Sequence, residues 1–402
     1  MKASTLLLAA TAMVGTTLAQ DWPRYLGPDG NARVEGEIST DWKSNKPEVL
    51  WEKDIGIGCT SFAVVDGKAV VMGNADGKDT VWCLDAKSGD VIWKYSYDEE
   101  LHPKYYEGGP SATPEIDGDR VYTLSKSGNL FCLSMADGQP IWHKHYQSDF
   151  GGKAPTWGYA AAPVVRGSVI YCLPCSKEAV YLLDKMTGEV KSKFGDKTKP
   201  GYSTPVFFDY QGKSAMAAFH GRELVTYDLK TGNELFDFTW RTSYDVNASN
   251  PQYHDGKLFL ASGYGMGYVV LDVSKGKAEV LHKEEDTRMI FQNSILIDGD
   301  ILGVFGDKNI DAELIRMDLA SGEVRWREKI PGTRGSSLMV GDTLIVLSEK
   351  GDIIAGKPTK GGWQEIGRVK PLKPRCWGPV AYSDGLVFAR GNKGQAICLK
   401  VK

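Results

Sequence analysis

Aromatic, amide and arginine side chains recur in the short segments that separate the apolar stretches of this sequence. Aromatic rings can stack on a flat ligand, and the planar guanidinium group of arginine binds a carboxylate through two parallel hydrogen bonds. These residue types therefore suit a flat, oxygen-rich or anionic ligand, a small carbohydrate, or a partner protein. In an alternative interpretation the rings cover one end of the fold and each arginine pairs with a nearby carboxylate. The predicted site consists of Trp157, Tyr159, Tyr202, Tyr244, Asn247, Asn250, Arg288, Gln292, Asn293, Arg334, Arg375 and Trp377.

No catalytic motif accompanies these residues. The sequence has no Gly-x-Ser-x-Gly, His-Glu-x-x-His or phosphate-loop pattern, so no catalytic residue is assigned. Cys172-Leu-Pro-Cys175 ends an apolar run and lacks a second Cys/His pair, which favours a structural disulfide or unreactive thiols over a redox or metal site. No metal ligands are assigned, and we predict a binding protein rather than an enzyme.

A repeat explains how the chain positions these segments. Eight glycine turns, most of them Asp-Gly, lie between paired apolar runs and follow one another at intervals of 42 to 51 residues, which indicates a repeat array. Within a repeat the order is strand, Asp-Gly turn, strand, short turn, strand, Asp-x-x-[Ser/Thr]-Gly turn, strand. Four antiparallel strands in about 45 residues form one blade of a β-propeller. The turn glycines are Gly67, Gly118, Gly167, Gly212, Gly256, Gly299, Gly341 and Gly385.

A tryptophan follows the second turn in several repeats, four residues after the turn glycine. Its large apolar area can lock an outer strand onto a neighbouring blade. We predict this structural role for Trp51, Trp93, Trp142 and Trp326, whereas Ser192, Phe236, Val280 and Ile366 occupy the same register in the other repeats.

The two ends of the repeat array are complementary. The last repeat, ending at residue 402, lacks a fourth strand, and residues 48–55 supply an extra strand with Trp51 in the expected register. We therefore predict an all-β, eight-bladed propeller in which the N-terminal strand closes the ring and removes exposed sheet edges.

The repeat resembles the PQQ-like β-propeller repeat, with its [Ala/Leu]-x-Asp-x-x-[Thr/Ser]-Gly-x-x-x-Trp docking motif, from about residue 22 to residue 402. That family includes quinoprotein dehydrogenases and BamB-type outer-membrane assembly factors. The resemblance implies PQQ and Ca²⁺ as conceivable cofactors and the oxidation of an alcohol or sugar as an alternative function. The vicinal Cys-Cys of many alcohol-oxidising members and the Cys-x-x-Cys-His haem signature are both missing here. A BamB-like assembly function is a further alternative.

The N-terminal residues and the charge balance predict where the protein acts. Residues 1–19 have the basic start, apolar run and small-residue end of a signal peptide, and no Cys follows the predicted cleavage point. We therefore expect a periplasmic or secreted protein without a transmembrane segment. Its 48 basic and 51 acidic residues disfavour a nucleic-acid partner. We predict an irregular lead-in at 20–47, a single propeller domain at 48–402, and a monomer.

Overall fold

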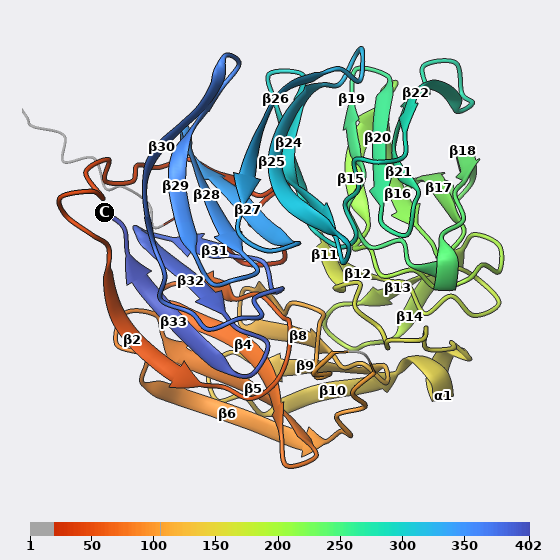
Figure 1. Ribbon diagram of the computed structural model, residues 1–402. Helices are drawn as coiled ribbons and strands as arrows, with labels where there is room; N and C mark the ends of the chain where they lie inside the picture. Colours follow the sequence, from red (N-terminus) through yellow and green to blue (C-terminus); the bar gives the residue numbers. More distant parts are fainter. Residues whose placement is uncertain (1–19, 105) are drawn as a thin grey trace, which may run out of the picture.

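The protein is an eight-bladed β-propeller, as the repeat predicted. The computed structural model describes residues 20–104 and 106–402, and shows eight sheets arranged in a ring (Figure 1). The predicted signal peptide at residues 1–19 lies outside the described residues. No helix in the described part of the chain is long and apolar enough to cross a bilayer.

Each blade contains four antiparallel strands that follow one another from the channel to the rim. Blades 1 to 4 consist of β3 (Ala63–Val65), β4 (Lys68–Ala75), β5 (Lys78–Asp85) and β6 (Val91–Asp98); β7 (Glu115–Asp117), β8 (Arg120–Leu124), β9 (Asn129–Ser134) and β10 (Pro140–His145); β11 (Val164–Arg166), β12 (Val169–Cys172), β13 (Val180–Asp184) and β14 (Val190–Phe194); and β15 (Val206–Tyr210), β16 (Lys213–Phe219), β17 (Glu223–Asp228) and β18 (Glu234–Thr239). Blades 5 to 8 consist of β19 (Gln252–His254), β20 (Lys257–Ser262), β21 (Gly267–Asp272) and β22 (Glu279–Glu284); β23 (Ser294–Ile297), β24 (Asp300–Asp307), β25 (Ile310–Asp318) and β26 (Val324–Ile330); β27 (Gly335–Val340), β28 (Thr343–Ser348), β29 (Ile353–Thr359) and β30 (Gly362–Val369); and β31 (Ala381–Ser383), β32 (Leu386–Arg390), β33 (Gln395–Lys400) and β2 (Glu48–Asp54). The remaining elements are β1 (Arg33–Val34), α1 (Tyr146–Phe150) and a 3₁₀ turn at Ser243–Asp245.

The ring closes as predicted from the sequence. Strand β2 pairs antiparallel with β33, and Trp51 lies opposite Cys398. Figure 1 shows these two strands, from opposite ends of the chain, side by side in the same blade. All four strands of the eighth blade are therefore present, and the ring has no open sheet edge between blades.

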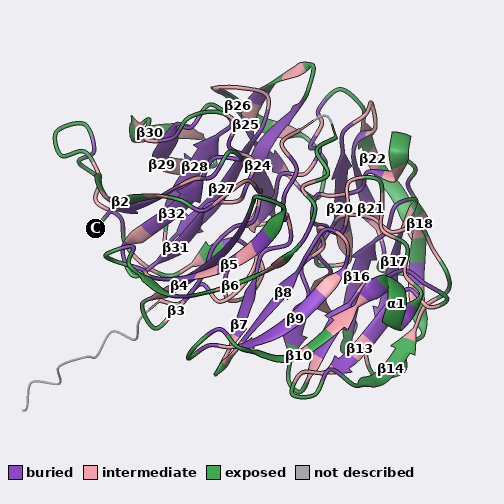
Figure 2. Cartoon of the chain, turned by 90° about the horizontal axis from the view of Figure 1, so that it is seen from below, coloured by how far each residue is buried: buried purple, intermediate pink, exposed green. Residues whose placement is uncertain are grey.

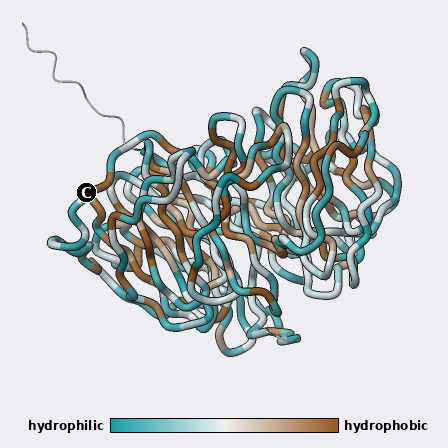
Figure 3. Tube along the Cα trace, turned by 45° about the horizontal axis from the view of Figure 1, so that its top comes forward, coloured by the Kyte–Doolittle hydropathy of each residue, from teal (hydrophilic) through white to brown (hydrophobic). Residues whose placement is uncertain are grey.

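Burial falls from the inner strands to the outer ones. All residues of β28 are buried, whereas four of the five residues of β14 are exposed. Figure 2 shows the same gradient, with most of the exposed segments at the rim, and Figure 3 shows apolar stretches along the strands and polar segments at the turns. The core is therefore a set of apolar layers between neighbouring blades.

Each outer-strand tryptophan of the motif contacts the turn of the next blade. Its indole Nε1 donates to a backbone carbonyl there, from Trp51 to Ala86 (3.0 Å), Trp93 to Met135 (2.9 Å), Trp142 to Lys185 (3.1 Å) and Trp326 to Thr359 (2.8 Å).

The turn glycine is needed because the ring lies directly against it. A Cβ atom on Gly138 would be 2.4 Å from Cε3 of Trp93. In blades 3 and 5, Phe194 and His282 lie against the turn glycine of the following blade, two residues beyond the register expected from the sequence. The motif thus describes an interblade contact rather than an isolated turn.

The lead-in segment lies across the inner strands of several blades. Trp22, which is fully buried, forms an antiparallel bridge with Val64 of β3, and β1 pairs in parallel with β27. The guanidinium of Arg33 donates to the carbonyl of Leu296 in β23 (3.1 Å). Residues 22–34 therefore contact blades on opposite sides of the channel.

Candidate functional site

Most of the predicted site residues belong to the connections between blades. A blade with four antiparallel strands starts and ends on the same side of the ring, so all connections from an outer strand to the next inner strand cross one face. We call this the loop face. The turns between the second and third strands of each blade lie on it too.

A compact cluster on the loop face surrounds Trp377. The guanidinium of Arg375 lies 4.6 Å from the centre of the Trp377 ring, and that of Arg334 lies 5.0 Å from it. The ring of Tyr106 stacks on Trp377 at 5.9 Å with an interplanar angle of 26°, and Phe291 lies 5.1 Å away. Neighbouring side chains of this protein therefore already occupy the contact surface of Trp377.

The arginines of this face have partners within the chain. Arg375 pairs with Glu107 at 2.8 Å and Arg334 with Glu349 at 3.4 Å. Arg288 donates through Nε to the carbonyl of Glu285 at 2.9 Å. These pairs satisfy much of the hydrogen-bonding capacity that an anionic ligand would need.

Both acidic partners are stabilised as carboxylates. Burial alone would raise the pKa of Glu107, but hydrogen bonds from Asn392 and Arg375 hold it below its ordinary value. The pKa of Glu349 is lowered in the same way, against burial, by hydrogen bonds that include one from Trp377 Nε1 (2.9 Å). At neutral pH the positive charges of Arg375 and Arg334 are therefore largely compensated.

A second group of aromatic side chains is more accessible. Tyr244 is 69% exposed and its backbone is in the left-handed region (φ 65°). The ring centre of Trp157 lies 6.1 Å from that of Tyr244 and 6.2 Å from that of Tyr202, and Tyr264 lies 6.1 Å from Tyr244. We call Trp157, Tyr202, Tyr244 and Tyr264 the aromatic platform. It brings together three predicted site residues and one that the sequence analysis did not identify.

The other predicted residues are buried and hold the connections in place. Tyr159 is 3% exposed and packs edge-on against Tyr146. The four amides each donate to a backbone carbonyl: Asn247 to His220 and Trp240, Asn250 to Thr204, Gln292 to Gly306, and Asn293 to Ser337. The structure does not place these five side chains at an accessible surface.

Several residues of the loop face were missed because they follow the second strand of a blade. Lys126 is 5% exposed, its Nζ donates to the Tyr106 hydroxyl, and burial lowers its pKa. Glu349 and Tyr264 occupy the equivalent turns of two other blades. The sequence did contain a signal for all three. In a blade of four antiparallel strands, the turn between the second and third strands lies on the same face as the connections between blades.

The residues around Trp377 do not fit a PQQ cofactor with calcium. A quinone needs an open aromatic face, and that of Trp377 is covered by Arg334, Arg375 and Tyr106. Calcium prefers six to eight oxygen ligands. Within residues 20–104 and 106–402, no three Asp, Glu, His or Cys side chains are close enough together to hold a metal ion.

The two cysteines of the Cys-x-x-Cys sequence are reduced and buried. Cys172 and Cys175 are 1% and 5% exposed, and burial raises the pKa of each thiol to about 12. The Sγ atom of Cys175 lies 3.6 Å from Nδ1 of His220, another buried side chain. The pair is therefore poorly suited to thiolate chemistry at neutral pH.

The sequence matches the family described as outer membrane protein assembly factor BamB over residues 30–95 and 99–328. No curated protein sequence matches it significantly. Among solved structures, BamB from Moraxella catarrhalis is 14% identical, with a TM-score of 0.61 over 89% of this chain and 98% of that one. Quinohemoprotein alcohol dehydrogenase from Comamonas testosteroni is 12% identical, with a TM-score of 0.69 over 95% and 80%. The computationally designed Ika8 protein is 13% identical, with a TM-score of 0.57 over 88% and 98%. At these identities the structural likeness shows the fold alone.

Proposed function

Since the chain belongs to the family described as outer membrane protein assembly factor BamB, we propose that it is a binding and scaffolding module of the cell envelope, exported to the periplasm or beyond. Its loop face binds a partner protein through the aromatic platform. The observation that carries this proposal is the exposure of Tyr244, 69%, in a group of four aromatic rings. Tyr and Trp are the side chains that most often dominate binding energy at protein interfaces.

The charges nearby favour a protein partner over a small anion. The three candidate arginines of the loop face already contact acidic side chains or a backbone carbonyl, and Arg222 next to the platform pairs with Asp245 at 2.7 Å. A partner that contributes apolar area to Tyr244 and Trp157 does not have to break these pairs. Removing one such aromatic anchor costs about 2 kcal/mol, or roughly a 30-fold loss of affinity.

Site-specific photocrosslinking in the native host tests the proposal. A photoreactive amino acid at position 244 should give one discrete protein adduct, and Trp157→Ala should weaken it strongly. The control position is Leu281, which is 48% exposed on the outer strand β22. An equal adduct at position 281, or no adduct at position 244, would contradict a protein site at the platform.

A quinoprotein dehydrogenase is the competing function, and a thermal melt separates the two. Residues 20–402 are melted with increasing PQQ, with and without Ca²⁺. A ligand that binds only the folded state at a hundredfold excess over Kd stabilises it by about 2.7 kcal/mol. We expect no saturable shift, and a calcium-dependent rise in Tm would replace the scaffolding proposal with the enzymatic one.

A further inference from the structure

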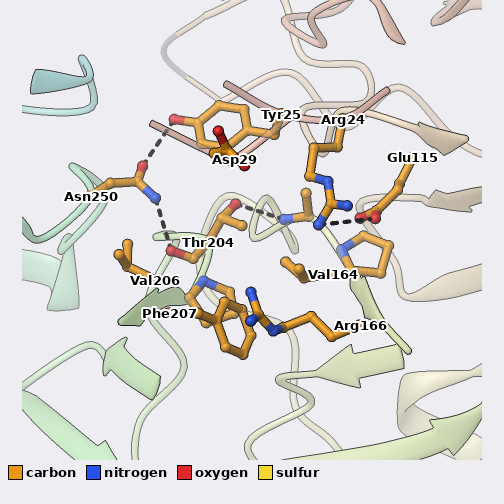
Figure 4. Close-up of a pocket in the computed structure, with 14 residues that line it drawn as sticks. Arg24, Tyr25, Asp29, Glu115, Val164, Arg166, Thr204, Val206, Phe207 and Asn250 are labelled. Atoms are coloured by element: carbon orange, nitrogen blue, oxygen red, sulfur yellow. Dashed lines mark hydrogen bonds and ion pairs between the residues drawn. The ribbon is translucent and has the colours of Figure 1, made fainter. Parts of the chain in front are cut away.

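A small cavity lies beside the lead-in segment, and none of its lining residues belongs to the aromatic platform. Residues of the lead-in segment cross the inner parts of blades 2 to 4 and enclose this cavity (Figure 4). Arg24 approaches it from the lead-in, Arg166 from the end of β11, and Phe207 from β15. Nothing in the proposed scaffolding function uses these residues.

The cavity contains arginine N–H groups without partners. Arg24 Nη1 donates to the carbonyl of Val165 at 3.2 Å, but its buried Nε has no hydrogen-bond partner among the described residues. The side chain of Arg166 forms no hydrogen bond or ion pair with any residue that the structure describes, and its guanidinium lies 4.6 Å from the centre of the Phe207 ring. Arg334 on the loop face also has a buried Nε without a partner, but it is ion-paired with Glu349, whereas Arg166 has no ion pair in the described residues; Arg24 and Arg166 therefore retain donors for a ligand.

The nearest acidic group compensates this charge only in part. Glu115 is 1% exposed, with Oε1 3.4 Å from Arg24 Nη1, and its Oε2 accepts from the backbone N–H of Val165 at 3.1 Å. Burial raises the pKa of Glu115 to about 8, although the charge of Arg24 opposes the shift. Burial therefore favours the neutral form of Glu115 near neutral pH, and Asp29, the other carboxylate that lines the cavity, balances only part of the charge of the two arginines.

The size and walls of the cavity restrict the ligand. Its volume is about 40 Å³, comparable to two or three water molecules and far below the roughly 300 Å³ of a typical cofactor pocket. Val164, Val206 and Phe207 supply apolar walls beside the two guanidinium groups, which Figure 4 shows on opposite sides of Val164. A planar carboxylate with a short apolar group matches both the donors and the walls.

We propose that this cavity binds the carboxylate of a small solute or of a peptide C-terminus, held by Arg24 and Arg166, with its short apolar group against Val164 and Val206. The carboxylate accepts from Arg24 Nη2, which has no hydrogen-bond partner among the described residues, and from the guanidinium of Arg166. Inorganic phosphate matches the cavity less well, because it has no apolar group to place against Val164 and Val206.

Titration calorimetry at constant ionic strength tests this site. The probes are acetate, propionate, N-acetylalanine, its uncharged amide, and inorganic phosphate, each added to the full chain. We expect saturable binding of the carboxylates and at least a tenfold weaker response to the amide and to phosphate. Tighter binding of N-acetylalanine than of propionate identifies a peptide C-terminus as the source, and the reverse order identifies a free small carboxylate.

Arg166→Gln should weaken carboxylate binding at least tenfold with only a small change in Tm, because the side chain is exposed, makes no hydrogen bond within the described residues and loses only its contact with the Phe207 ring. Arg166→Lys, which keeps the charge but not the planar fork, should recover part of the affinity. Arg241→Gln is the matched control, since Arg241 is exposed and lies outside the cavity. Undiminished binding in Arg166→Gln, equally tight phosphate, or no saturable binding by wild type would each overturn the assignment.

Discussion

Replacing Gly138 by alanine tests whether the repeated turn is shaped by its neighbouring blade. The residue has a positive φ of 73°, which costs an alanine about 1 kcal/mol. In addition, the new methyl group would lie 2.4 Å and 2.7 Å from two ring atoms of Trp93, well inside van der Waals contact. Trp93 is 7% exposed and its Nε1 is hydrogen-bonded to Met135 O, so the ring has little freedom to move away. Overpacking of this kind costs a further 1–3 kcal/mol or so, for a total of about 2–4 kcal/mol.

The matched control is Gly118→Ala in the same blade. Gly118 also has a positive φ, 59°, but a Cβ atom there would meet nothing within 4 Å. We therefore expect it to lose only about 1 kcal/mol. Trp93→Ala alone removes a nearly buried indole and should cost about 3–5 kcal/mol.

The double variant separates strain from collision. Without the indole, Gly138→Ala should cost only the backbone strain of about 1 kcal/mol, giving a coupling energy of about 1–3 kcal/mol with Trp93. Urea unfolding followed by far-ultraviolet circular dichroism measures all four proteins. The reasoning is refuted if Gly138→Ala costs no more than Gly118→Ala, or if its cost is unchanged after Trp93→Ala.

Three further predictions concern buried polar groups. Burial lowers the pKa of His220 to about 4, below its unfolded value near 6.5. As the pH is lowered from 6.5 to 4, the free energy of unfolding should therefore decrease by up to about 1.4 kcal/mol per pH unit. His220→Gln should remove this slope in melts from pH 7 to pH 4.5. Asp300 is fully buried between two arginines, so Asp300→Ala should lower the free energy of unfolding by about 3–5 kcal/mol in urea titrations. Asp298→Ala removes a carboxylate that is 66% exposed and should lower it by less than about 1 kcal/mol. In native thiol labelling followed by mass spectrometry, the partly exposed Cys59 should react before the buried Cys172, and equal rates would contradict the packing.

The fold could be predicted because its determinants repeat. Asp-Gly turns and the Asp-x-x-[Ser/Thr]-Gly-x-x-x-Trp pattern each involve fewer than ten neighbouring residues, so their periodicity gives the blade count and the closing strand. The partner of Trp93 could not be identified in this way. The indole contacts a glycine 45 residues further along, and only the assembled ring brings the two together.

The site was predicted less completely because polar residues were judged by type and not by partner. Asn247 and Asn293 have the same amide group as a ligand-binding residue, yet each satisfies backbone carbonyls that a connection between blades leaves unpaired. Composition alone does not distinguish these two uses. Exposure does: Tyr159, the four amides and Arg334 are buried, and the accessible members of the predicted set are Trp157, Tyr202, Tyr244, Arg288, Arg375 and Trp377.

The arginines show why charge at the loop face is weak support for an anionic ligand. Arg375 and Glu107 are 268 residues apart in the chain, but they pair at 2.8 Å because the closed ring brings the connection between blades 7 and 8 close to the one between blades 1 and 2. A closed ring brings such distant charges together and lets them neutralise one another. An arginine with free donors is therefore more informative than an arginine at the expected position, and in the described residues Arg166 meets that condition away from the loop face.

The aromatic platform and the cavity beside Arg166 then represent separate binding properties, one suited to apolar protein surface and the other to a single carboxylate. Loss of photocrosslinking in Trp157→Ala with unchanged carboxylate binding would establish their independence.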